Sequence, residues 1–446
     1  MEQRQCRKRE RIRDPAINIK RRSIDLKKVV ILKGNIIHTP ERSEFQCVKN
    51  GYLVAEDNEI QGIYQNLPGK YEGQLVTDWG DALIMPGMYD MHVHAPQYVY
   101  RGLGLDMQLM DWLNTYAFPT EARFQDPEYA KVYYRAFAQA LKKNGTARAV
   151  IFSTIHWETT EILMDILEEE KVGGFAGKIN MDTLSPDFLC EDSRQSLEDT
   201  RCWLERNINK RELVKPAVTP RFIPTCTTEV LEGLGELAKE FNVPVHSHIS
   251  EDIGEMEIVR GRYPEYDNDG AVYDHFGLLT NHTVMAHFIY PTDEELRLVR
   301  DRGVTIAHCP QSNGNVAAGI PPIRRMLDMG IKVGLGSDIA GGYSPCIFRA
   351  MSEAVYLSKL CWLQSGKKDS FLTIPEAFYL GTKGGGQFFG KLGSFETGNE
   401  LDALVIDDSS LNVKLDELTL EQRMERVIHL ADDRNIVGRY VAGEKA

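Results

Sequence analysis

Two histidines separated by one residue follow an apolar stretch early in the chain. His92 and His94 stand at the end of the run over residues 83–91. Side chains alternate along a strand, so residues two apart project from one face and both imidazoles can reach one metal ion. By itself, however, a His-x-His pair is equally typical of histidines that only pack in a core. The pair therefore predicts a metal site only if other ligands join it.

Four further polar residues hold equivalent places later in the chain, each at the end of a short β-rich run. They are His248, His287, His308 and Asp338. In a barrel of parallel strands, side chains at the carboxyl ends of the strands converge on one mouth, so residues far apart in sequence become neighbours. We therefore expect these four side chains to gather around the early histidine pair.

Three imidazoles and one carboxylate form the expected metal site. They belong to His92, His94, His248 and Asp338. This set suits one zinc ion with a bound water, and zinc lowers the pKa of such a water to about 7. We expect one ion per chain, because the strand that could offer a bridging lysine ends instead in Arg221. Lys178, one strand earlier, is interpreted as a structural residue whose amine reaches solvent.

Glu251 lies on the loop that leaves the strand of His248. From there a carboxylic acid can reach over the metal site without binding the ion. Hydrolytic loss of an amine from an amidine-like ring carbon requires one proton on a ring nitrogen and another on the departing amine. Glu251 is therefore the predicted proton shuttle, and the alternative is a glutamate that only faces solvent.

The pattern between Ala82 and about Gly390 predicts the element that positions these residues. Brief β-rich runs alternate with helix-like stretches, as at 127–143, 228–241 and 292–301. Such alternation is typical of a parallel sheet with helical crossovers. The eight expected strands lie near 83–91, 147–153, 173–180, 215–221, 243–249, 283–287, 304–309 and 331–336. Together they predict an α/β fold, a (β/α)8 barrel of the TIM type.

Both ends of the chain contain short apolar runs that indicate strands of a second unit. These runs lie at 29–32, 52–54, 60–64, 402–406 and 438–443. We expect them to form one small composite β domain. The predicted domains are a basic tail over 1–28, the first part of the β domain over 29–81, the barrel over 82–392 and the second part of the β domain over 393–446.

Charge and composition restrict the class of partner. The 446 residues carry a formal net charge of -13, which disfavours a nucleic acid and suits a small neutral substrate. The basic tail is interpreted as solvated, with nuclear targeting or an acidic partner as alternatives. The absence of a long apolar run predicts a cytoplasmic protein without membrane contact. Eight cysteines without a C-x-x-C pair indicate reduced thiols.

Several of these segments resemble the guanine deaminases of the metal-dependent amidohydrolase superfamily, in the same order. The similar segments are residues 86–98, 219–222, 247–251, 284–287, 306–310, 334–344 and 432–436. The resemblance extends from about residue 30 to 443. It implies the barrel fold, a zinc cofactor, a purine substrate and a homodimer.

The resemblance also implies roles for individual residues. Gln97 and Arg221 would hydrogen-bond the guanine edge, and Phe222 would line its flat face, whereas the alternative for Arg221 is a surface ion pair. Asp338 would serve both as metal ligand and as base, and His287 would orient the water. The implied reaction is hydroxide attack at C2 of guanine, protonation of N3 by the shuttle glutamate, and loss of ammonia to leave xanthine, a step of purine catabolism or salvage.

Three positions depart from the pattern expected of that family. Phe288 replaces a glycine, so its ring could reshape the site wall, and Gln311 replaces an asparagine. His246 replaces a glutamine and is interpreted as a core histidine beneath the metal, because it shares a strand face with His248. A related amidohydrolase that acts on adenine, 8-oxoguanine, a pterin or a triazine stays an alternative. So does a non-catalytic scaffold on the same fold, although every predicted ligand is retained.

Overall fold

The structure, a computed structural model, describes residues 28–368, 370–411 and 417–446. The predicted basic tail, apart from Lys28, lies outside these ranges. Among the described helices, none has the length and apolar character needed to cross a membrane. The seven cysteines in the described ranges form no disulfide with one another.

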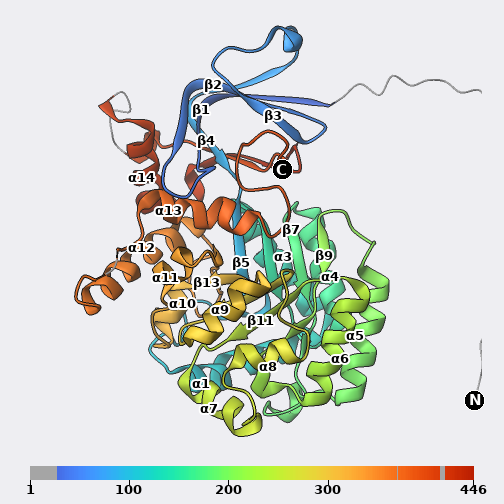
Figure 1. The fold of residues 1–446 in the computed structure, drawn as a ribbon. Coiled ribbons are helices and arrows are strands. Elements are labelled where there is room, and N and C mark those ends of the chain that lie inside the picture. The colour runs from blue at the N-terminus through green and yellow to red at the C-terminus, as the bar shows by residue number, and fades with distance from the viewer. Residues whose placement is uncertain (1–27, 369, 412–416) are drawn as a thin grey trace, which may run out of the picture.

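Strands from both ends of the chain pair in one seven-stranded sheet, in the order β17-β16-β15-β4-β1-β2-β3, at the top of Figure 1. Its members are β1 (Val29–His38), β2 (Gln46–Glu56), β3 (Glu59–Tyr64), β4 (Val76–Pro86), β15 (Ala403–Ile406), β16 (Ile436–Val441) and β17 (Glu444–Lys445). The two halves meet where β15 runs antiparallel to β4, with Leu404 opposite Met85. Apolar side chains of both halves, such as Leu32 and Val405, share one core.

The remaining strands are parallel and form two four-stranded sheets, β5-β6-β7-β9 and β11-β12-β13-β14, with β8 and β10 as a separate pair. Their bounds are β5 (Met88–His94), β6 (Thr146–Phe152), β7 (Gly173–Gly177), β8 (Ile179–Asn180), β9 (Val214–Pro216), β10 (Thr219–Pro220), β11 (Val245–Ile249), β12 (Thr283–His287), β13 (Thr305–His308) and β14 (Lys332–Leu335). A parallel bridge between Val218 and Val245 links the sheets. The opposite edges of the two sheets also meet, because the backbone amide of Asp338, after β14, donates to the carbonyl of His92 in β5 at 2.8 Å.

The prediction of one strand over 83–91 is wrong in its first part. Residues 83–86 belong to β4 of the seven-stranded sheet, and β5 begins only at Met88. Between them Gly87 donates to the Asp402 carbonyl, and a Cβ at this glycine would lie 2.7 Å from that of Ala147. A continuous apolar run conceals such a change of sheet, because hydrophobicity does not report which partner a strand has. β5 also continues through His94, so both histidines lie within the strand.

The helices flank the parallel strands, with α4, α5 and α6 on one side of the view in Figure 1 and α10, α11 and α12 on the other. Their bounds are α1 (Leu109–Trp112), α2 (Phe118–Ala122), α3 (Pro127–Lys143), α4 (Trp157–Glu169), α5 (Ser193–Asn207), α6 (Thr228–Phe241), α7 (Ile253–Arg262), α8 (Asp269–His275), α9 (Asp293–Arg302), α10 (Pro310–Asn315), α11 (Ile323–Asp328), α12 (Ile347–Gln364), α13 (Ile374–Tyr379) and α14 (Leu420–Leu430). The predicted helices over 127–143 and 228–241 are confirmed. The third begins one residue later than predicted, because Thr292 is its N-cap and forms a capping box with Glu295.

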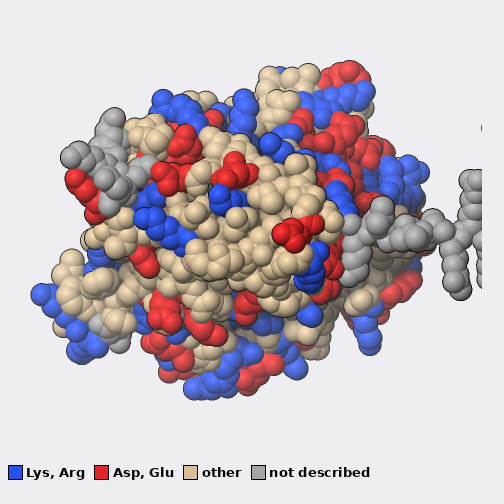
Figure 2. Space-filling view, turned by 90° about the horizontal axis from the view of Figure 1, so that it is seen from above, with Lys and Arg blue, Asp and Glu red and all other residues tan. Residues whose placement is uncertain are grey.

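Seen from above in Figure 2, the surface carries basic and acidic side chains interspersed around a broad area of other residues. A polyanion is attracted by a concentrated field of one sign. The described residues on this face therefore form no continuous field of one sign.

Candidate active site

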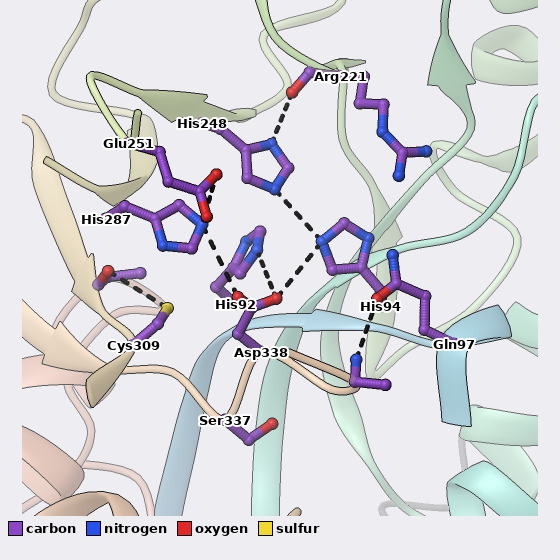
Figure 3. A network of polar contacts seen from close by, with 12 residues as sticks. His92, His94, Gln97, Arg221, His248, Glu251, His287, Cys309, Ser337 and Asp338 are labelled. Carbon is purple, nitrogen blue, oxygen red and sulfur yellow. Dashed lines mark hydrogen bonds and ion pairs between the residues drawn. The ribbon is translucent and has the colours of Figure 1, made fainter. Parts of the chain in front are cut away.

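The predicted metal ligands lie together at the carboxyl ends of the parallel strands (Figure 3). β5 carries His92 and His94, and β11 carries His248. Nε2 of His94 lies 3.3 Å from Nε2 of His248. Asp338, which follows β14, places Oδ1 3.2 Å from Nε2 of His92 and 3.5 Å from Nε2 of His94. Four side chains from three distant parts of the sequence thus point toward one small volume, and all four are buried.

Hydrogen bonds behind the cluster fix which nitrogen of each ring faces it. Nδ1 of His248 donates to the Arg221 carbonyl at 2.6 Å, which leaves Nε2 as the lone-pair nitrogen. Nδ1 of His92 lies 2.7 Å from Nε2 of His246, and Nε2 of His92 has no hydrogen-bond partner among the described residues. Such outer contacts orient imidazoles for metal binding.

The donor set fits a metal ion. Two groups of candidate ligands share His92, one with His94 and His248 and one with His287 and Asp338, and within each group the ligand atoms lie within 4.8 Å of one another. Burial lowers the pKa of all three predicted histidine ligands, which favours the neutral rings that ligation requires. Burial opposes the charge of Asp338, but the adjacent His92 holds the pKa of this carboxyl well below its usual value.

Glu251 lies at the edge of the cluster, on the loop after β11. Its Oε2 is 3.5 Å from Nε2 of His287, which in turn is 3.8 Å from Oδ2 of Asp338. Nδ1 of His287 lies 2.8 Å from Oδ1 of Asn313, on α10. Burial raises the pKa of Glu251 to about 7, with a further contribution from Asp338 and an opposing one from His287. A carboxyl group of this kind can both give and take a proton near neutral pH.

A cavity of about 360 Å³ opens onto the cluster and is lined mainly by apolar atoms. The three predicted substrate-binding residues, Gln97, Arg221 and Phe222, all line it, together with Glu251 and His287. The side chain of Arg221 is 4% exposed, so the alternative of a surface ion pair is wrong. Trp112 and Leu113, which the sequence analysis did not select, supply part of the apolar wall.

Glu121 is the most prominent polar residue of the site that the sequence analysis missed. It lies on α2, is fully buried, and accepts from the guanidinium of Arg221 and from the amide of Gln97. No spacing rule connects it with Arg221, which is 100 residues away. The local sequence offered only a weak signal, a single carboxylate between Phe118 and Phe124.

Asp90 was also missed. It is fully buried on β5 and accepts from both the amide and the hydroxyl of Ser337, at 2.9 and 2.5 Å. These contacts fasten the loop that carries Asp338 to the strand that carries His92. Asp338, with φ 44°, and His287, with φ 73°, both have left-handed backbones. Non-glycine residues in this region store strain, which is characteristic of functional sites.

The predicted positions of two side chains, His308 and Lys178, are wrong. His308 does not join the cluster: it lines a separate cavity with Pro321 and Trp362. Its neighbours in the strand, Ala307 and Cys309, face the inner core, so alternation directs His308 to the opposite side. The amine of Lys178, which was expected to reach solvent, is buried instead.

Lys178 is fully buried, and its amine forms an ion pair with Glu191 and a hydrogen bond to Ser196 at 3.3 Å. A buried partner can hold a lysine that would otherwise extend to the surface. These contacts agree with the interpretation of Lys178 as a structural residue. They contradict the reason given for that interpretation, which was that its amine extends to solvent.

The three departures from the family pattern have different consequences. Phe288 takes a left-handed backbone with φ 52°, which explains why a glycine suits this position, but its ring packs in the main core and does not line the cavity. The expectation of a reshaped wall is therefore wrong. Gln311 accepts from the Ser344 amide at 3.3 Å. His246 is a buried histidine, as predicted, but it also contacts a metal-site ring.

Comparison with known proteins agrees with this geometry. The model of the Amidohydrolase family matches residues 83–446. The guanine deaminase of Dictyostelium discoideum is 35% identical over 441 residues, which cover 94% of this chain and 98% of that protein. The guanine deaminase of Homo sapiens is 38% identical over 440 residues, which cover 93% of this chain and 96% of that protein.

Among solved structures, the guanine deaminase of C. acetobutylicum with guanine bound in its active site superimposes with a TM-score of 0.92 and 44% identity, and covers 94% of this chain and 100% of its own. The chain belongs to the amidohydrolase family, whose members are built on a TIM-like barrel. The three relatives named above, which match over nearly the full length of this chain, are guanine deaminases.

Proposed function

We propose that this chain catalyses the hydrolytic deamination of guanine to xanthine and ammonia. The observation that carries the proposal is one cavity in which a histidine and aspartate cluster, a buried carboxylic acid and two base-edge donors meet. The relatives named guanine deaminase, which match at 35% to 44% identity, support guanine over other heterocycles.

The cofactor is one zinc ion per chain. His92, His94, His248 and Asp338 would hold it, since three neutral imidazoles and one carboxylate are a set that zinc prefers. When bound, zinc would act as a Lewis acid and favour ionisation of the attacking water. The donor atoms of His92, His94 and His248 lie within 4.8 Å of one another, and Oδ1 of Asp338 lies 3.2 Å from Nε2 of His92, which supports this assignment.

The proton transfers fall to side chains of the chain itself. Asp338 accepts a proton from the attacking water, and His287, between Asp338 and Glu251, orients that water. Glu251 gives a proton to N3 of guanine as C2 is attacked. The proton that Asp338 took from water then passes to the departing amine, and the hydroxyl proton on C2 returns to Glu251 as the new carbonyl of xanthine forms. The raised pKa of Glu251, about 7 through burial, suits a group that exchanges protons in each turnover.

Substrate orientation falls to Gln97, Arg221 and Phe222. The guanidinium and the amide donate to O6 and the ring nitrogens of the base, while Phe222 lies against its face. This arrangement presents C2, the carbon that loses the amine, to the metal cluster.

The arrangement of the whole chain is part of the proposal. The two parallel sheets close into a (β/α)8 barrel that begins at β5 and not at the predicted residue 82, and the segments 29–86 and 393–446 form the composite β domain. The bridge between Val218 and Val245 and the contact from Asp338 to His92 support closure. The shared seven-stranded sheet supports the β domain. A homodimer and a cytoplasmic location stay predictions.

Guanine turnover with and without a metal chelator tests the function. Purified protein should release xanthine from guanine, contain about one zinc per chain, lose activity with chelator and regain it with added zinc. A panel of adenine, 8-oxoguanine, a pterin and a triazine tests the alternative substrates. Negligible xanthine alongside turnover of another compound would contradict the choice of guanine, and zinc-free protein without any turnover would support the scaffold.

A further inference from the structure

A carboxylate outside every sequence motif lies behind the two side chains assigned to the base edge. Glu121 is fully buried on α2. Its Oε2 accepts from Nη1 of Arg221 at 2.6 Å, and its Oε1 accepts from Nη2 at 3.1 Å. Two parallel contacts of this kind fix the plane of a guanidinium. The ring of Phe118, with its centroid 5.2 Å from Cζ of Arg221, limits movement from another side.

Glu121 also holds Gln97. Nε2 of Gln97 donates to Oε1 of Glu121 at 3.2 Å, and Oε1 of Gln97 accepts from the Ala340 amide at 3.0 Å. A carboxylate can only accept and a backbone N–H can only donate, so the two ends of the amide cannot exchange places. One carboxylate therefore sets the orientation of both base-edge residues before a ligand arrives (Gln97 and Arg221 are shown in Figure 3).

The same contact balances the charge of Arg221. Arg221 is 3% exposed and Glu121 is 0% exposed, so water screens neither charge strongly. An uncompensated guanidinium at this place would favour an anionic ring over a neutral one. Paired with Glu121, it presents N–H donors with little net charge, which suits a neutral oxo-purine such as guanine.

We infer that Glu121 is a positioning residue that makes the pocket specific for a neutral, oxo-bearing purine, because it orients Arg221 and Gln97 and balances the charge of Arg221. This inference rests on the proposed function, which assigns the guanine edge to these two side chains.

Glu121→Gln tests the inference, since it keeps the size of the side chain and removes its charge. The KM for guanine should rise at least about tenfold while kcat changes less than about threefold, the pattern of lost ground-state binding. Urate, a purine that is anionic at neutral pH, should become a stronger inhibitor relative to guanine, so the ratio of its inhibition constant to the guanine KM should fall. An unchanged KM or an unchanged ratio would overturn the inference.

Glu121→Asp tests the role of Glu121 if the glutamine variant does not fold. This variant keeps the negative charge but shortens the side chain by one methylene, so it loosens the contacts to Arg221 and Gln97. The guanine KM should rise while the ratio of the urate inhibition constant to the guanine KM stays at the wild-type value. A KM that does not move, or a ratio that falls, would contradict the role of Glu121.

A matched control is the pair of Asp408 and Arg423, which is also buried and has two contacts, at 2.9 and 2.5 Å. It lies outside the cavity, so Asp408→Asn should lower stability without changing the guanine KM or the urate ratio.

Turnover of guanine by the wild type separates the role of Glu121 from the proposed function. If guanine is not a substrate, the proposed function fails, and the same ratio is measured with whichever panel compound is turned over.

Discussion

Nε2 of His246 lies 2.7 Å from Nδ1 of His92, and both rings are fully buried. Nε2 of His92 faces Asp338, so Nδ1 carries the proton when His92 is a metal ligand, and His246 accepts that proton in a hydrogen bond. The glutamine expected at this position could accept through its amide oxygen in the same way. His246 therefore holds the ring of His92 in the tautomer that a metal requires.

His246→Leu should weaken zinc binding about 10- to 100-fold, the usual effect of removing a hydrogen-bond partner of a ligand, whereas His246→Gln should keep most of the affinity. Zinc transfer to a chromophoric chelator measures this without reference to activity. His308→Gln is a matched control, because His308 is equally buried but lies outside the cluster. Equal zinc affinity in the leucine variant and the wild type would refute the assignment.

Glu251→Gln should lower kcat at least a hundredfold, because an amide of the same size cannot deliver the proton to the substrate. Zinc content should stay at the wild-type value, since Glu251 is not among the predicted ligands. Steady-state kinetics and metal analysis measure the two quantities. Glu257→Gln, on the exposed side of α7, is the control and should have normal activity. Turnover close to normal in the Glu251 variant would remove this residue from the mechanism.

Arg221→Met should raise the KM for guanine at least tenfold or abolish turnover, because the base loses its charged hydrogen-bond donor. The metal should remain, since it is the backbone carbonyl of Arg221, not its side chain, that accepts from His248. Kinetics and zinc analysis on one preparation test both statements. Arg201→Met provides a comparison, because Arg201 also pairs with a glutamate but is 45% exposed. A kinetic profile like that of the wild type would place Arg221 outside the binding site.

Stability should fall with rising pH in part because of Glu295. Burial raises the pKa of this carboxyl from 4.5 to about 7, so the folded state binds its proton more tightly than the unfolded chain does. The resulting stabilisation is complete below pH 4.5 and is lost as the pH rises through about 7. Glu295→Gln imitates the protonated form and should therefore gain on the order of 1–3 kcal/mol relative to the wild type between pH 5 and pH 8.

Denaturant unfolding at several pH values measures this difference. Raised pKa values of the nearby Asp269 and Glu255, both due first to burial, act in the same direction and persist in the variant, so its stability should still decline, but less steeply. Glu294→Gln, at the adjacent exposed position, should reproduce the wild-type curve. Parallel curves for the wild type and the Glu295 variant would show that Glu295 does not titrate in this range.

Much of the metal site was predictable because its signal is local. The alternation of a strand places His92 and His94 on one face, and the carboxyl ends of parallel strands bring His248 and Asp338 to the same mouth. The resemblance added Gln97, Arg221 and Phe222, which line the cavity as expected. The direction of His308 was misjudged, because a residue at a strand end can belong to either face until the strand's exact register is known.

The amino-acid sequence alone indicates the chemical groups of the site and the order of the strands that carry them. Only the tertiary structure revealed that Glu121 holds Arg221, that His246 contacts His92, and that residues 83–86 pair with the terminal strands. Periodicity and capping depend on neighbours a few positions apart. These contacts join residues separated by 100 positions or more and follow no pattern of strand ends, so they depend on how loops and sheets pack in space.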